Sequence, residues 1–177
     1  MKNELRKKLA SIRHNIPEKR EKSIRILNNL VSLPVYISSR SVMVYISFGD
    51  EVDTRIFIEK MLKDGKILSA PLCTGDGIME ARQFSSFSDL EEGKFGILAP
   101  KGKSIACPDL ILVPGLGFSR DFFRIGYGGG YYDRFLKDKR STSCGIFFDE
   151  QFVDFVPDSH DAALDYIITE KKILKRE

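Results

Sequence analysis

The sequence predicts an α/β protein in which an open, mostly parallel sheet lies between two layers of helices. Short apolar runs that are typical of buried strands alternate with segments whose apolar residues have helical spacing. This alternation favours parallel strands joined by helices, three layers in all, because each connecting helix covers a face of the sheet. The length of 177 residues suits one domain with a substantial core, so we expect residues 1–177 to form a single α/β domain.

The first half of the chain contains five expected elements. They are a helix over 2–14, a helix from Pro17, a strand over 42–47, a helix over 54–65 and a strand over 66–71. Apolar residues recur at helical spacing in the first two, and Pro17 suits the first position of a helix. Asp53 is the predicted N-cap of the third helix, which Gly65 closes.

The second half adds further strands and one helix. The expected elements are a hairpin within 78–84, a strand over 109–115, a loop over 115–130, a helix over 131–139, and strands over 143–148 and 164–169. In open sheets of this kind ligands bind beyond the carboxyl ends of the strands. We therefore expect a Rossmann-like arrangement whose ligand site lies at the loops 48–54 and 115–130.

Composition argues against several classes of protein. No apolar run approaches the ~18 residues of a membrane span, so no membrane association is expected. Cys73, Cys107 and Cys144 form no CxxC pair, which argues against a zinc site or a disulfide framework and favours the cytoplasm. We expect these cysteines to be small core residues, and a monomer is compatible with the sequence.

The net charge is +3, and it is distributed unevenly. Residues 1–25 carry a net charge of +6, and the remainder carries −3. A basic amino-terminal segment can bind the phosphates of a nucleotide or of nucleic acid, or it can form a solvated helix face. Because the remainder is acidic and no RNA- or DNA-binding motif is present, we expect no nucleic-acid partner.

The glycine-rich run RIGYGGGYYDRFL, residues 124–136, lies between the strongest strand and a helix. Glycines let backbone N–H groups approach an anion, and the amino end of a helix adds positive potential, so the run favours phosphate binding. It matches neither the P-loop nor the dinucleotide fingerprint, and a flexible turn is the alternative. Arg120, Arg124 and Arg134 favour the phosphate interpretation. Asp133 could hold Mg²⁺ or interact with the helix dipole.

The same run carries a resemblance to a known family. PDLILVPGLGFSRDFFRIGYGGGYYDRFL (108–136) resembles the signature of the 5-formyltetrahydrofolate cyclo-ligases, also called 5,10-methenyltetrahydrofolate synthetases. Three other blocks resemble segments of that family in the same order: KNELRKKL (2–9), YISFGDEVDT (45–54) and PDSHDAALDYIITE (157–170). The resemblance therefore extends over nearly the whole chain.

The resemblance implies an enzyme that converts 5-formyltetrahydrofolate to 5,10-methenyltetrahydrofolate with ATP and Mg²⁺. In the implied chemistry the N5-formyl oxygen attacks the γ-phosphate, N10 then closes the ring, and phosphate leaves. An amide oxygen is a poor leaving group, and phosphorylation makes it a good one. Such a phosphoryl transfer requires mainly alignment of the reactants and neutralisation of the phosphate oxygens.

The resemblance also implies the site residues. ATP would be bound by Lys2, Arg6, Arg124, Ile125, Gly126, Tyr127, Gly128, Gly129, Gly130, Tyr131 and Tyr132, with Arg124 and Tyr131 in catalytic roles. The folate would contact Ile46, Phe48, Glu51, Phe118 and Tyr127, and Mg²⁺ would be held by Asp133 and Asp165. Some family members carry basic residues inside the glycine run, where this chain has Tyr127 and Gly129. Charge neutralisation would then depend more on Lys2, Arg6, Arg124 and the metal.

Alternatives to several assignments remain open. Phe48 and Phe118 could be core residues, and Glu51 could be an ordinary acid in the first turn of a helix. His160 next to Asp161 resembles a catalytic pair, but no nucleophile motif accompanies it, so we expect a structural role. For the whole protein, the competing functions are an isomerase or transferase acting on sugar phosphates or acyl groups, and a nucleic-acid-binding protein.

Overall fold

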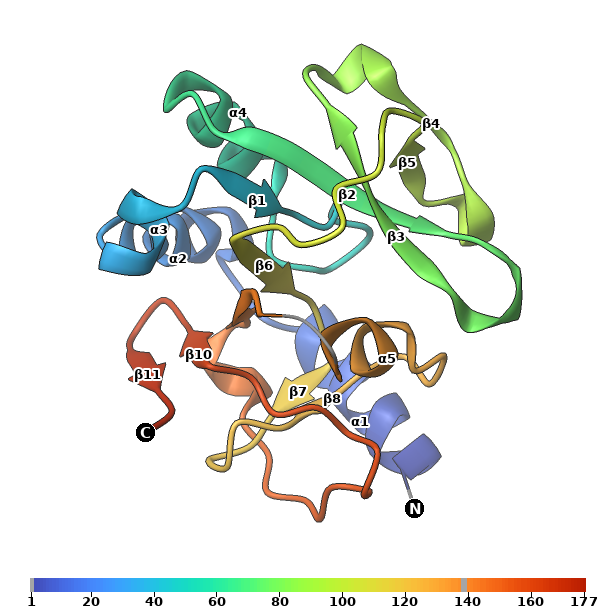
Figure 1. Cartoon of the computed structure of the whole chain (residues 1–177). Helices are drawn as coiled ribbons and strands as arrows, with labels where there is room; N and C mark the ends of the chain where they lie inside the picture. The colour runs from blue at the N-terminus through green and yellow to red at the C-terminus, as the bar shows by residue number, and fades with distance from the viewer. Residues whose placement is uncertain (1, 138–139) are drawn as a thin grey trace.

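A computed structural model describes residues 2–137 and 140–177, and every side chain among them except that of Asp76. A seven-stranded sheet runs through the molecule in the order β11-β10-β9-β6-β1-β2-β3 (Figure 1). Its strands are β1 (Ser41–Met43), β2 (Ile67–Cys73), β3 (Met79–Phe84), β6 (Leu110–Val113), β9 (Thr142–Ile146), β10 (Tyr166–Ile168) and β11 (Ile173–Lys175). The strands from β10 to β2 are parallel, and the edge strands β3 and β11 are antiparallel to their neighbours. The predicted mostly parallel sheet is confirmed.

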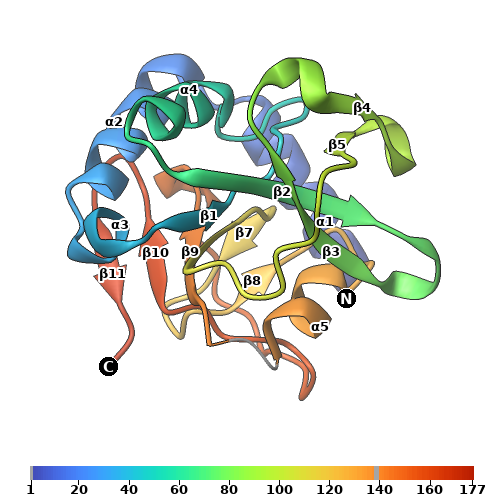
Figure 2. The same ribbon diagram turned by 45° about the horizontal axis from the view of Figure 1, so that its top comes forward.

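Helices cover both faces of the sheet. They are α1 (Lys2–His14), α2 (Lys19–Val31), α3 (Pro34–Ser38), α4 (Arg55–Lys63) and α5 (Tyr131–Lys137). Figure 2 shows α2 and α4 above the sheet and α5 below it. Successive strand residues alternate between the two layers, since Val42 packs in the cluster with α2 and α4 whereas Met43 packs in the cluster with Phe135 of α5. The predicted three-layer α/β class is confirmed.

The first helix packs beside the loop that follows β6. Leu9 of α1 is buried in a small cluster with Leu116 and Ile125. A Cβ at Gly117 would lie 2.9 Å from Leu9 Cδ1 and 2.9 Å from the carbonyl oxygen of Gln151. Glycine is therefore needed at 117 for α1 to approach this loop so closely. As a result, the basic face of α1 lies next to the glycine-rich run.

The order of the strands makes the boundary between β1 and β6 a switch point, with one loop following each of these strands. From β1 the chain continues to β2 on one side, and from β6 it continues to β9 on the other. In doubly wound sheets the crevice at such a switch point is where ligands bind. The loops that follow β1 and β6 are the two that the sequence singles out, so the fold supports their choice.

The region between β2 and β6 differs from the prediction. Residues 79–84 form the single strand β3, which pairs with β2 through the short turn η1 (Gly75–Gly77), so the predicted hairpin within 78–84 is wrong. A separate hairpin follows, and its strands are β4 (Leu90–Glu92) and β5 (Leu98–Pro100). Its tip is the turn η3 (Lys94–Gly96), where Phe95 has a φ of 64°. The predicted loop 115–130 also contains a small hairpin, β7 (Gly117–Phe118) and β8 (Arg124–Ile125).

Several predicted boundaries shift by a few residues. The strand expected over 42–47 ends as β1 at Met43, although the Val44 N–H still donates to Ser69 O at 2.8 Å. Thr54, not Asp53, immediately precedes α4, and Asp53 Oδ1 accepts the Arg55 N–H at 3.0 Å. The helix expected over 131–139 is present as α5, and its last two residues lie outside the described ranges. Neither α3 nor β11 was expected.

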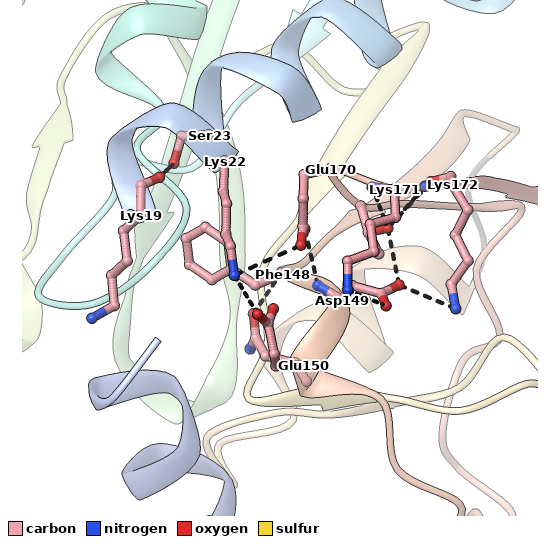
Figure 3. A network of polar contacts seen from close by, with 11 residues as sticks. Lys19, Lys22, Ser23, Phe148, Asp149, Glu150, Glu170, Lys171 and Lys172 are labelled. Carbon is pink, nitrogen blue, oxygen red and sulfur yellow. Dashed lines mark hydrogen bonds and ion pairs between the residues drawn. The ribbon is translucent and has the colours of Figure 1, made fainter. Parts of the chain in front are cut away.

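A buried ion network fixes α2 to the far end of the sheet (Figure 3). Lys22 of α2 is 8% exposed, and its ammonium contacts Glu150 and lies 3.9 Å from Oε1 of Glu170. Asp149, one residue before Glu150, pairs with Lys172 at 3.1 Å. Burial raises the pKa of Glu150, but the hydrogen bond and the charge of Lys22, together with smaller contributions that include the charge of Lys171, hold that pKa below its usual value. The charges in this network are mutually neutralised.

Two composition-based expectations can be compared with the fold. Among the described residues, no helix has both the length and the hydropathy needed to cross a bilayer. Among the described residues the three cysteines form no disulfide: Cys144 is buried, Cys73 is half-buried, and Cys107 is exposed, so the core assignment is wrong for Cys107.

Candidate functional site

The loop after β1 is held in shape by hydrogen bonds between its two ends. Thr54 Oγ1 donates to Tyr45 O at 2.6 Å and accepts the Ser47 N–H at 2.9 Å. At the tip of this loop, Oε2 of Glu51 accepts the N–H of Phe48 at 2.9 Å. These contacts fix the carboxylate of Glu51 before any ligand arrives, on one side of the crevice.

Glu51 faces the glycine loop across the crevice. The hydroxyl of Tyr127 donates to Oε1 of Glu51 and accepts a hydrogen bond from Arg13 Nη1 at 2.8 Å. Burial raises the pKa of Glu51, although Tyr127, Phe48 and Arg13 all favour its charged form. Phe48 is 61% exposed beside it. An acceptor carboxylate next to an exposed aromatic ring suits a flat, apolar ligand that carries N–H donors.

The glycine loop, residues 126–130, presents backbone donors on the other side of the crevice. A Cβ at Gly129 would lie 2.8 Å from the ring of Tyr131, and Gly130 has a φ of +65°, so side chains are disfavoured at both positions. In the described part of the chain, the N–H groups of Gly126, Gly128, Gly129 and Gly130 donate no hydrogen bond. Unpaired N–H groups at the start of a helix form a cradle for an anion.

Two arginines hold this loop in place. Arg6 Nε donates to Gly126 O at 3.0 Å, and Arg134 Nη2 donates to Gly129 O at 2.6 Å. Arg134 also donates to Gly77 O at 3.0 Å, which joins the glycine loop to the turn between β2 and β3. The two guanidinium groups therefore add positive charge beside the unpaired N–H groups, as a phosphate would require.

Lys2 does not reach the glycine loop. Its ammonium lies 2.5 Å from Asp158 Oδ2 and 2.8 Å from Asp161 Oδ2. Burial opposes the charge, but the hydrogen bonds to these carboxylates raise the pKa of Lys2. Asp158, His160 and Asp161 offer metal-binding atoms within 4.8 Å of one another, but the ammonium of Lys2 already binds both carboxylates. Of the two expected phosphate contacts on α1, the structure brings Arg6 to the loop and not Lys2.

Arg124 and Asp133 form a buried pair. Arg124 is 7% exposed, and its Nη1 donates to Asp133 Oδ1 at 3.0 Å. The same oxygen accepts the Ala162 N–H at 3.0 Å. The guanidinium also lies 5.7 Å from the ring centre of Tyr132. Arg124 therefore lies behind the glycine loop, with its charge balanced by Asp133.

The two carboxylates expected to hold Mg²⁺ line one cavity of about 560 Å³. Asp165 Oδ2 accepts the N–H and the hydroxyl of Ser143, and its Oδ1 accepts from Arg176 at 3.2 Å. Carboxylate oxygens are the donors that Mg²⁺ prefers, so the donor chemistry fits this metal. A metal ion there would share Asp133 with Arg124 and Asp165 with Arg176.

Three expected contact residues are buried in the core instead. Phe118 is 0% exposed, and its ring centre lies 5.1 Å from that of Phe147 and 5.7 Å from that of Phe152. This packing supports the core interpretation of Phe118 over a pterin contact. Ile46 and Ile125 are 4% and 1% exposed, so their side chains also face the interior. Of the expected aromatic folate contacts, Phe48 and Tyr127 are exposed instead.

Sequence reasoning missed two groups of residues at this site. Arg13 is buried at the end of α1 and donates a hydrogen bond to Tyr127. Its position seven residues after Arg6 could have indicated this contact, because residues two helical turns apart lie on the same face. Lys94 Nζ lies 3.4 Å from the hydroxyl of Tyr131, and the Phe95 ring lies edge-on to the Tyr131 ring. No local pattern indicates that the tip of the β4–β5 hairpin reaches α5.

His160 supports the structural interpretation. Its side chain is 74% exposed, and its Nε2 lies 3.9 Å from Asp161 Oδ1, beyond hydrogen-bonding distance. Asp161 instead accepts from Lys2 and from the Asp158 N–H.

Comparison with known proteins gives consistent results over nearly the whole chain. A family model described as the 5-formyltetrahydrofolate cyclo-ligase family matches residues 1–170. The Schizosaccharomyces pombe protein named probable 5-formyltetrahydrofolate cyclo-ligase is 32% identical over 175 residues, which cover 86% of each chain.

Two solved structures have the same fold. The 5,10-methenyltetrahydrofolate synthetase from Aquifex aeolicus has a TM-score of 0.86 at 33% identity, and the match covers 98% of this chain and 92% of the other. The 5,10-methenyltetrahydrofolate synthetase from Mycoplasma pneumoniae has a TM-score of 0.79 at 25% identity, with 96% and 98% covered. The loops after β1 and β6 both lie within residues 1–170, the range that the family model matches.

Proposed function

The chain belongs to the 5-formyltetrahydrofolate cyclo-ligase family, and on that premise we propose that it uses ATP and Mg²⁺ to convert 5-formyltetrahydrofolate to 5,10-methenyltetrahydrofolate. The enzyme class predicted from the sequence is confirmed by the family match and by the structural neighbours. No observation of the fold favours either competing function. A cytoplasmic location, supported by three cysteines that form no disulfide among the described residues, is part of the proposal, as is a monomeric state.

The observation that carries the proposal is the pairing of two different surfaces across one crevice. The glycine loop offers unpaired N–H groups beside Arg6, which suits the phosphates of ATP. Glu51 offers a fixed carboxylate beside the exposed ring of Phe48, which suits a pterin, because one edge of a pterin carries N–H donors. Tyr127 contacts Glu51 and belongs to the glycine loop, so the two ligands would meet there.

The proposed reaction uses this proximity. The formyl oxygen of the folate attacks the γ-phosphate of ATP, ADP leaves, and N10 closes the ring as phosphate departs. The chain contributes alignment through the two loops, and positive charge through Arg6 and Arg134. Arg124 and Tyr131 are proposed to act where the glycine loop meets α5. Lys2, which pairs with Asp158 and Asp161 in this structure, is proposed to leave these partners and bind the phosphates.

We assign Mg²⁺ binding to Asp133 and Asp165 by the same proposal. When bound, the ion would neutralise charge on the phosphate oxygens. The support is the oxygen donor chemistry and the shared cavity. Gly126, Gly128, Gly129 and Gly130 are proposed to approach ATP through the backbone, together with the backbone of Ile125, since the side chain of Ile125 is buried. Tyr132 completes the proposed ATP set.

An absorbance assay tests the proposal. Purified protein is mixed with 5-formyltetrahydrofolate, ATP and Mg²⁺, and the near-ultraviolet band of the methenyl product is followed. We expect the band to grow only when all three are present. Growth of the band without ATP would contradict phosphoryl activation, and no growth with binding of ATP intact would contradict the folate assignment.

A further inference from the structure

Arg13 is a buried charge for which the proposed chemistry has no role. It lies in the last turn of α1 and is 9% exposed. Burying an arginine is costly unless its donors find partners, so a buried guanidinium next to a ligand crevice requires an explanation. Its contacts supply one.

The guanidinium of Arg13 contacts the glycine loop at Tyr127 and the chain after β6 at Gly115. Its Nη1 donates to the hydroxyl of Tyr127 at 2.8 Å and to the carbonyl oxygen of Gly115 at 3.3 Å. Its Cζ also lies 5.7 Å from the ring centre of Tyr127. Gly115 O additionally accepts from Gln151 Nε2 at 3.1 Å, so the base of the loop is held from two sides. Arg13 therefore determines where the hydroxyl of Tyr127 lies.

Tyr127 passes this constraint to Glu51. The residue Tyr127 is 55% exposed, but its hydroxyl is held between Arg13 and Glu51, accepting from the first and donating to the second. The other oxygen of Glu51 accepts the Phe48 N–H. A continuous set of hydrogen bonds thus joins helix α1, the glycine loop and the loop after β1, and it ends at the carboxylate proposed to bind the pterin.

We propose that Arg13 is a positioning residue for folate binding. It acts through the hydroxyl of Tyr127, which keeps the carboxylate of Glu51 charged and correctly oriented. The inference rests on the proposed function, because it assumes that Glu51 receives the folate. Arg13 itself does not touch the substrate in this proposal. Glutamine at position 13 would leave Tyr127 free to turn and would remove the positive charge that faces the carboxylate.

Electrostatics supports the same assignment. Burial raises the pKa of Glu51, and the charge of Arg13 lowers it. Other titratable or charged groups near Glu51 come from several elements: Tyr45 after β1, Tyr132 on α5, Lys19 and Arg20 at the start of α2, Asp53 on the same loop, and Arg55 on α4. Arg13 is the cation that acts on Glu51 through a hydrogen-bonded side chain. Its removal would raise the pKa of Glu51 further, so the carboxylate would take up a proton at higher pH.

Steady-state kinetics of Arg13→Gln tests the proposal. The KM for 5-formyltetrahydrofolate should rise about 10- to 100-fold, since a buried hydrogen bond to a charged group is lost. The KM for ATP should rise less than the KM for the folate, because Arg13 contacts the glycine loop only at the side chain of Tyr127. The acid limb of kcat/KM for the folate should move to higher pH, and Arg13→Lys should restore part of the loss. Lys8→Gln, an exposed change on the same helix, is the control and should behave like the wild-type protein.

A double-mutant cycle with Tyr127→Phe separates positioning from a merely structural role. If Arg13 acts through the Tyr127 hydroxyl, the two losses of affinity should not add. The double variant should then bind 5-formyltetrahydrofolate with about the same affinity as the single variant that binds it less tightly. Calorimetry without ATP measures this binding even if turnover is low. If Arg13→Gln does not fold, the folate affinity of Tyr127→Phe alone tests the proposal. Additive losses, an unmoved acid limb, or an equal rise in both KM values would overturn the inference. An inactive wild-type protein that binds no folate would instead overturn the proposed function, and the inference with it.

Discussion

Two regions of the molecule gather polar groups inside the fold: the ion network around Lys22 and the crevice between Glu51 and the glycine loop. In the network each charge faces an opposite one. Even Glu170 Oε1, which accepts no hydrogen bond from residues 2–137 or 140–177, lies 3.9 Å from Lys22 Nζ. In the crevice, Arg13 Nε and Tyr132 Oη are buried without a hydrogen-bond partner among the described residues. Buried polar atoms left unpaired cost free energy, so the fold satisfies the polar groups of the crevice less completely than those of the network.

The two regions should therefore respond differently to substitution. Changes in the network should lower the free energy of unfolding and leave binding of substrates intact. Changes in the crevice should weaken binding or turnover and leave the free energy of unfolding almost unchanged, whereas a change at Asp133 should lower both turnover and stability, because buried Arg124 then loses its partner. Each variant below is measured for both properties.

The largest effect is expected for Asp133→Asn, which removes a proposed metal ligand and the partner of buried Arg124. We expect kcat to fall about 10³-fold or more, because charge neutralisation at the phosphates is lost. Asp154→Asn is the matched control, since it breaks the exposed pair with Arg120 and should leave kcat unchanged. Wild-type turnover in Asp133→Asn would contradict the metal assignment.

The next largest effect is expected for Lys22→Met, which leaves Glu150 and buried Glu170 without their cation. The free energy of unfolding should fall by about 3 kcal/mol, while the KM values for ATP and folate stay the same. Denaturant unfolding measures the first and steady-state kinetics the second. Lys60→Met, which breaks the exposed pair with Asp64 on α4, should cost no more than about 0.5 kcal/mol. A similar loss of stability in both variants would remove the distinction between buried network and surface pair.

A smaller and more selective effect is expected for Gly126→Ala. A Cβ there meets nothing within 4 Å, and the φ of Gly126 is not left-handed, so the free energy of unfolding should not fall. If phosphates lie against this backbone, the new methyl group should weaken ATP binding about 10-fold, which is ~1.4 kcal/mol. Gly75→Ala is the matched control, because it has the same open surroundings in the turn before β3. Unchanged ATP affinity in Gly126→Ala would mean that the loop does not hold the nucleotide.

The sequence predicted the parts of the fold that depend on local patterns. The run LILV of β6 is buried on both faces, as its uninterrupted apolar character indicates, and the helices from α1 to α5 begin near the predicted residues, apart from the short α3. The hairpin within 78–84 was wrong because the partner of β3 is β2, which precedes the turn at 75–77. Turn residues show where a chain reverses, but they do not show which strand lies on the other side.

Only those parts of the site whose residues lie close together in the sequence could be predicted. The glycine loop and Glu51 were identified, but the contacts that join them were not. Tyr127 lies 76 residues after Glu51 and 114 residues after Arg13 in the sequence. Phe118 was expected at the site because of its position in the sequence, but it lies in the core. It directly follows Gly117 in the loop, yet it packs against Phe147 and Phe152, because the small hairpin of β7 and β8 turns it into the core. Which side a loop residue faces depends on such long-range packing.

The most direct test of the central claim, that the crevice and not the network binds the substrates, is the KM of Glu51→Gln for 5-formyltetrahydrofolate. Glutamine keeps the shape and an acceptor for the Phe48 N–H, and it removes the charge. We predict that the folate KM rises about 10-fold or more, while the ATP KM and the melting temperature stay as in the wild-type protein. An unchanged folate KM in a folded, active Glu51→Gln variant would contradict the account.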